Sequence, residues 1–179
     1  MIGLAAGTVL AHGFGGPGWL HPLTGWDHIL AMTAVGAWSA QLGKRALWMV
    51  PAGFVAAMAA GAAAGLAGLR IPGLEPIISA SVVLLGLAIA SRLRITTIVA
   101  AAAVAAFGLC HGFSHGLEYA AQDGKAAYVF GILATTAGLH VVGAVGALLV
   151  AGSPGGPRYL RLAGAAAAAA GLGLLLAVV

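Results

Sequence analysis

Long uninterrupted apolar runs fill almost the whole chain, and each is about as long as a lipid bilayer is thick. A helix needs roughly 20 mostly apolar residues to cross the hydrocarbon of a bilayer. Short stretches that hold charges, prolines and glycines separate the runs, which predicts helices over 25–41, 46–69, 74–91, 95–119, 126–151 and 159–179. The pattern therefore predicts an all-α integral membrane protein, a bundle of about six transmembrane helices in a single domain over residues 1–179.

The scarcity of charge supports a membrane environment. Only 7% of the residues are charged, whereas a soluble domain carries about 25% because its surface must be wetted. The net charge of +4 then reflects basic loops rather than a nucleic-acid partner. No Gly-x4-Gly-Lys-Ser/Thr phosphate loop is present, so no nucleotide partner is expected. Cys110 is the single cysteine, which excludes an intramolecular disulfide and a multi-thiolate zinc site.

The first eleven residues, 1–11, are apolar but too short to span a bilayer. They lack the basic start of a secretory signal peptide. We interpret them as a short extra N-terminal segment rather than as a seventh span.

Small residues are abundant in the predicted spans and indicate close helix packing. The chain has 29 glycines, two of which form the pattern Gly61-x-x-x-Gly65. Small residues at this spacing let helix backbones approach one another in lipid. The alanine run 165–170 has the same interpretation.

The basic residues predict an orientation, because lysine and arginine accumulate in cytoplasmic loops. Six lie after the first, third and fifth predicted helices, namely Lys44, Arg45, Arg92, Arg94, Arg158 and Arg161. The other two loops hold Arg70 and Lys125. Both termini are therefore expected on the outer side of the membrane.

With this orientation, nearly all imidazole and carboxylate groups fall in the outer half of the membrane or near its centre. Buried ionisable groups cost several kcal/mol each, and a divalent cation that they bind would compensate this cost. At about 100° per residue, His111, His115 and Glu118 share one helical face. The proposed metal ligands are His21, Asp27, His28, His111, His115, Glu118 and His140.

Each of these residues also has an ordinary structural interpretation. Thr24-x-x-Asp27 matches a capping box, in which Asp27 satisfies amides of the first helical turn. His140 can hydrogen-bond to Thr136 one turn earlier, and Glu118 can be a solvated interfacial acid. Glu75 is interpreted as such an acid. Met32 and Cys110 are assigned to packing.

The same residues resemble the HupE/UreJ-type nickel and cobalt permeases. The resemblance rests on His21-Pro22-Leu23, Gly25 and Asp27-His28 in the first span, on His111-Gly112, His115-Gly116 and Glu118 in the fourth, and on His140 with Val142-Gly143 in the fifth. It implies metal uptake for hydrogenase or urease, with the residues of the first and fourth spans needed for transport. Cys110 and Ser114 depart from the usual family pattern, in which an aromatic residue and an alanine often precede the two histidines.

The leading hypothesis is a permease for nickel or cobalt in a bacterial inner membrane, with the ion bound transiently and no prosthetic cofactor. Lipid and the divalent ion are the expected partners, and the sequence leaves homo-oligomerisation open. The alternative is an intramembrane zinc hydrolase with three histidine ligands, including a His-Asp-Ser amidase of the ceramidase type. The chain has no His-Glu-x-x-His or Gly-x-Ser-x-Gly motif. A helical assembly subunit without a site of its own is the third alternative.

Overall fold

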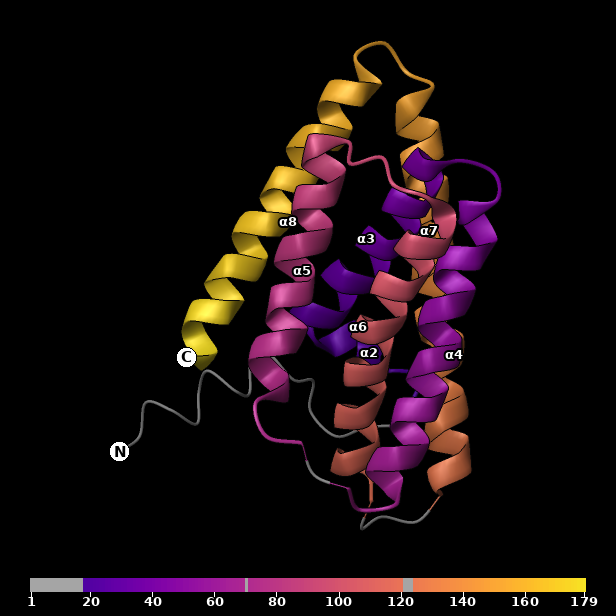
Figure 1. Ribbon diagram of the computed structural model, residues 1–179, viewed down its shortest axis with the longest axis vertical. Coiled ribbons are helices and arrows are strands. Elements are labelled where there is room, and N and C mark those ends of the chain that lie inside the picture. The colour runs from indigo at the N-terminus through magenta and orange to yellow at the C-terminus, as the bar shows by residue number, and fades with distance from the viewer. Residues whose placement is uncertain (1–17, 70, 121–123) are drawn as a thin grey trace.

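Helices make up most of the part of the chain that the computed structural model describes, residues 18–69, 71–120 and 124–179 (Figure 1). In chain order they are α2 (His21–Thr24), α3 (Trp26–Leu42), α4 (Ala46–Leu66), α5 (Leu74–Ser91), α6 (Thr97–Glu118), α7 (Lys125–Ala151) and α8 (Gly156–Val178). The predicted N-terminal segment over residues 1–11 lies outside the described residues.

The predicted bundle of about six membrane helices is confirmed. Five of the described helices, α4 to α8, are long and apolar enough to cross a membrane. The remaining long helix, α3, has 17 residues and is the shortest of the six. The largest differences in boundary are at α4, which ends before the left-handed Gly68, and at α8, which begins earlier with Pro157 in its first turn. A proline is tolerated there because the first amides of a helix have no intrahelical acceptor.

The helices pack mainly in pairs, which Figure 1 displays with the bundle axis vertical. α4 lies along α6, α3 along α7, and α5 along α8. The first two pairs run in parallel, and the third is antiparallel. α3 also contacts α4 and α5, so the helix that follows the His21 segment lies inside the bundle.

Glycines make the contact between α4 and α6 very close. A Cβ atom at Gly112 or Gly116 would overlap the carbonyl oxygen of Met58 or Ala62, respectively. On α4, a Cβ atom at Gly61 would overlap the carbonyl of Leu109, which confirms the close packing predicted for Gly61-x-x-x-Gly65. This contact fixes the depth of α6, and therefore of His111 and His115, relative to the rest of the bundle.

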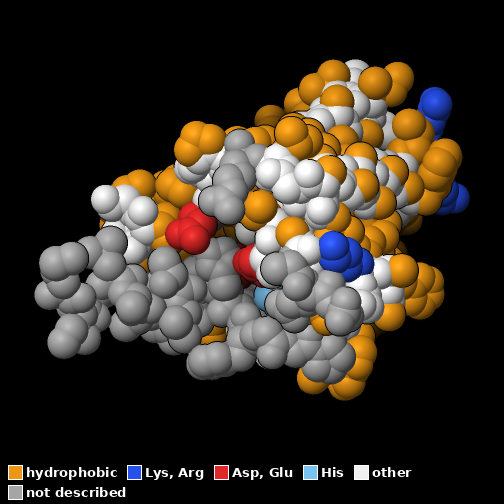
Figure 2. Space-filling model, turned by 90° about the horizontal axis from the view of Figure 1, so that it is seen from below, with side chains coloured by type: hydrophobic (Ala, Val, Ile, Leu, Met, Phe, Trp, Pro, Cys, Tyr) orange, Lys and Arg blue, Asp and Glu red, His pale blue; other side chains and the backbone are white. Residues whose placement is uncertain are grey.

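The charged residues gather at the two ends of the bundle. The loops after α3 and α5 and the first turns of α8 carry six lysines and arginines at one end, whereas Glu75, Glu118 and the start of α3 lie at the other, together with Lys125. Figure 2 views the molecule toward the second end and shows acidic side chains near the edge of a histidine, with hydrophobic side chains on the flanks. The bundle thus presents apolar sides between a basic end and an end that carries the described acids and Lys125, called the acidic end below.

Candidate metal site

The junction between α2 and α3 carries three of the predicted site residues, His21, Asp27 and His28. Gly25 separates the two helices with an extended backbone, at φ −98° and ψ 122°. This break lets the adjacent side chains of Asp27 and His28 both face inward, as predicted, with exposed fractions of 1% and 0%. The capping-box interpretation is wrong. The Thr24 hydroxyl donates to the carbonyl of His21 at 3.0 Å, and no side chain caps α3.

The last two turns of α6 supply the other side of the site. His111 and His115 are one turn apart, and both are fully buried. Glu118 lies one turn further, where α6 ends, and its side chain is 36% exposed. The three residues share one face, as their spacing predicts. They run from the interior of the bundle to its acidic end.

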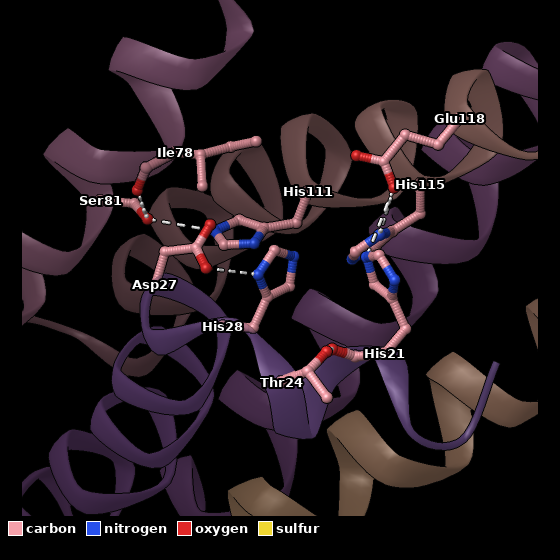
Figure 3. A network of polar contacts seen from close by, with 9 residues as sticks. All are labelled: His21, Thr24, Asp27, His28, Ile78, Ser81, His111, His115 and Glu118. Carbon is pink, nitrogen blue, oxygen red and sulfur yellow. Dashed lines mark hydrogen bonds and ion pairs between the residues drawn. The ribbon is translucent and has the colours of Figure 1, made fainter. Parts of the chain in front are cut away.

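The imidazoles of the two segments converge, and we call His21, His28, His111 and His115 the histidine cluster (Figure 3). The ring centre of His28 lies 5.2 Å from that of His111 and 4.5 Å from that of His115. His21 lies 4.6 Å from His115 by the same measure. Residues separated by more than 80 positions in the chain therefore meet at one depth.

Three members of the cluster could hold a metal ion together. One ring nitrogen from each of His21, His28 and His115 lies within 4.8 Å of the other two. Imidazole nitrogens bind a zinc ion at about 2.0–2.1 Å in tetrahedral geometry, which places neighbouring ligand nitrogens roughly 3.3 Å apart. The three nitrogens are therefore close to the separation that one bound ion requires.

Asp27 lies behind His28. Its Oδ1 is 2.8 Å from Nδ1 of His28, so the imidazole donates to the carboxylate through that nitrogen. Nε2 of His28 makes no hydrogen bond to any described residue. A carboxylate that accepts from one ring nitrogen fixes the orientation and tautomer of a metal-binding histidine. The geometry of Asp27 suits this role.

Glu118 bridges the outer part of the cluster. Its Oε2 is 3.4 Å from Nε2 of His21 and 3.9 Å from Nδ1 of His115. Because the carboxylate is partly exposed, it connects two buried imidazoles with the acidic end of the bundle. Glu75, expected to be a solvated acid, is half-buried in the first turn of α5.

Ser81 of α5 joins the site, although it is not among the predicted ligands. Its hydroxyl donates to the carbonyl of Ile78 at 2.6 Å, and its oxygen lies 3.2 Å from Nε2 of His111. Since the hydroxyl proton is used in the first bond, the oxygen accepts from His111. The only signal in the sequence is that Ser79 and Ser81 are polar residues within an apolar span.

His140, predicted to be a further metal ligand, does not join the histidine cluster. The fully buried ring of Phe54 contacts both His111 and His140, with ring centres 5.6 and 5.1 Å away. The alternative hydrogen bond to Thr136 is wrong, because neither the His140 ring nor the Thr136 hydroxyl has a hydrogen-bond partner among the described residues. His140 thus lies across an aromatic ring from the cluster.

Comparison with known proteins identifies the family. Residues 2–174 match the family described as HupE / UreJ protein. The chain is 42% identical to Protein HupE of Rhizobium leguminosarum bv. viciae over 174 residues, which is 97% of this chain and 87% of that relative. No solved structure matches the chain. The chain therefore belongs to the HupE/UreJ family, which comprises membrane metal transporters rather than enzymes.

Proposed function

We propose that this protein takes up nickel or cobalt ions across a bacterial inner membrane through the histidine cluster. The observation that carries the proposal is the group of three buried imidazoles, His21, His28 and His115, whose ligand atoms lie within 4.8 Å of one another. Membership in a family of metal transporters supports a divalent metal ion as the transported substrate. It also favours a transporter over the alternative of an intramembrane zinc hydrolase.

The chemistry of the donor set fits a transported ion rather than a permanently bound one. Imidazole nitrogens and carboxylate oxygens suit divalent first-row metals, and they are weaker ligands than thiolates. A transport site must bind an ion strongly enough to replace its water and weakly enough to release it. Three imidazoles with a partly exposed Glu118 meet both requirements better than a closed four-ligand site.

The positions of the residues support a direction of travel. Glu118 is the exposed member at the acidic end, His21 and His115 are its nearest partners, and His28 and His111 lie deeper along α3 and α6. We propose that the ion enters at Glu118, binds the cluster, and passes Phe54 toward His140. In this scheme Asp27 orients His28 and carries negative charge beside the ion.

The orientation is a separate prediction that labelling can test. Single cysteines at Lys44, Arg94 and Ser153, in a Cys110→Ser background, are expected to resist an impermeant thiol reagent added outside intact cells. A cysteine at Lys125 is expected to react, because that end of the bundle should face outward. Membrane permeabilisation, which must expose the first three positions, is the control. The reverse labelling pattern would contradict the entry side proposed above.

Uptake into proteoliposomes is the direct test of function. Vesicles that contain the purified protein should accumulate radioactive nickel or cobalt faster than empty vesicles, and the other of the two ions should compete. Magnesium and calcium, which prefer all-oxygen sites, should compete poorly. Accumulation equal to that of empty vesicles for every first-row ion would refute the proposal.

Asp27→Asn is expected to lower metal affinity by roughly 10- to 100-fold, because loss of an orienting carboxylate has effects of this size. The asparagine keeps the shape of the side chain but removes its charge. Its amide nitrogen can also face Nδ1 of His28 without accepting a proton from it. Isothermal titration of the detergent-solubilised protein with nickel measures the change. Ser79→Ala, a buried polar residue of α5 with no role assigned at the site, is the control. An affinity equal to that of the wild type would remove Asp27 from the proposed site.

A further inference from the structure

Two hollows meet at the basic end of the bundle, away from the interior of the histidine cluster. The first has a volume of about 180 Å3, and its polar lining is Gln41, Arg92 and Arg94. The second is an apolar groove of about 380 Å3 between α7 and α8, with α3 as its floor. Leu160 lines both, so the polar hollow opens at the end of the groove.

The groove has the character of a lipid-facing surface. Its walls include Val142, Gly146 and Val150 of α7, and Leu160 and Ala163 of α8, while Leu30 contributes to the floor. α8 packs chiefly against α5 and makes few contacts with α7. The two helices are joined at the basic end of the bundle and diverge from there (Figure 1). Within a bilayer, an apolar groove of this kind is accessible to acyl chains.

The polar hollow carries positive charge with no acid beside it. Arg92 and Arg94 form no ion pair with any described residue, and the described acids Asp27, Glu75 and Glu118 lie at the opposite end of the bundle. Gln41 adds a further polar group, whose buried Oε1 has no hydrogen-bond partner among the described residues. Arg158 and Arg161 line a neighbouring hollow of about 320 Å3. The unpaired positive charge at this end therefore favours the binding of an anion.

We propose that these two hollows form one binding site for an anionic glycerophospholipid such as phosphatidylglycerol. The phosphate lies between Arg92 and Arg94, and one acyl chain fills the groove between α7 and α8. Basic pockets at the cytoplasmic side of membrane helices bind anionic headgroups through the same chemistry. The bound acyl chain contacts α3 at Leu30, half a turn beyond His28. The lipid therefore packs against the helix that positions Asp27 and His28.

The test compares lipid binding by matched variants. Native mass spectrometry of the protein titrated with phosphatidylglycerol or phosphatidylcholine gives the affinity for each. The double variant Arg92→Gln/Arg94→Gln is expected to lose about 30-fold in affinity for phosphatidylglycerol, which corresponds to about 1 kcal/mol for each arginine. Lys44→Gln/Arg45→Gln removes the same charge at the same end, outside the hollow, and should change the affinity by less than about 3-fold.

A second pair of variants tests the groove. Gly146 lines it, and a Cβ atom there meets no other atom within 4 Å, so Gly146→Leu fills the groove without displacing the backbone. Gly138 lies on the same helix with equal space around it but outside the groove, and Gly138→Leu is the control. Gly146→Leu should lower the affinity for phosphatidylglycerol, and Gly138→Leu should leave that affinity unchanged. The proposal would be overturned if the wild type bound phosphatidylcholine as tightly as phosphatidylglycerol. It would also be overturned if Arg92→Gln/Arg94→Gln bound phosphatidylglycerol as tightly as the wild type does.

Discussion

Replacing His28 with alanine is expected to reduce nickel or cobalt uptake to the level of empty vesicles. His28 is the central ring of the histidine cluster, with His21, His111 and His115 all within 5.8 Å of its ring centre. Its loss removes one of three converging ligands and leaves the Asp27 carboxylate buried without its imidazole partner. Loss of an orienting group alone lowers metal affinity by up to about 100-fold. Because His28→Ala removes a ligand itself, we expect the metal affinity to fall by about 100-fold or more.

Two controls separate this effect from misfolding. Met32→Leu changes a fully buried residue one turn after His28, and a swap of similar volume in a core costs less than about 1.5 kcal/mol. Cys110→Ser changes the neighbour of His111, a half-buried cysteine assigned to packing. Both variants should transport the ion at nearly the wild-type rate. His28→Ala should elute from size-exclusion chromatography as the wild type does. Uptake by folded His28→Ala at half the wild-type rate or more would contradict the proposed role of the cluster.

Much of the fold could be predicted because the bilayer constrains a membrane chain so strongly. The hydrocarbon accepts helices of a narrow range of lengths and few charges. The helix pattern therefore follows from the apolar runs, and the boundaries of α5 were predicted to the residue. The alternation of the spans then places His28, at the start of the first, and His115, near the end of the fourth, at the same end of the bundle, where the structure has them in contact.

The details of the site could not be predicted, because they depend on which helices are neighbours. Hydropathy gives the depth of a residue but not its partners across the bundle. Ser81 was missed for this reason, since only the packing of α5 brings it to His111. His140 was grouped with the other histidines from depth alone, whereas the ring of Phe54 lies between. The role of Asp27 likewise depends on the break at Gly25, which directs its carboxylate to Nδ1 of the next residue.

Gly112→Val is expected to have the largest effect on stability, because Gly112 lies where the backbones of α4 and α6 touch. Its Cβ atom would overlap the carbonyl oxygen of Met58, which belongs to a helix backbone and cannot rotate away. The two helices must separate, and overpacking of this kind costs about 3 kcal/mol or more. The melting temperature in detergent, followed by tryptophan fluorescence, should fall by roughly 10 °C.

The same substitution should also impair metal binding, which distinguishes this contact from simple packing. Gly112 lies between His111 and His115, so any outward movement of α6 carries both imidazoles away from His28. Gly138→Val is the matched control, because a Cβ atom there meets nothing within 4 Å. It should keep both the wild-type melting temperature and the wild-type affinity for nickel. If Gly112→Val melted and bound nickel as Gly138→Val does, the glycine contact could not be what holds the α6 histidines in place. The convergence of the cluster would then have to depend on α2 and α3 alone.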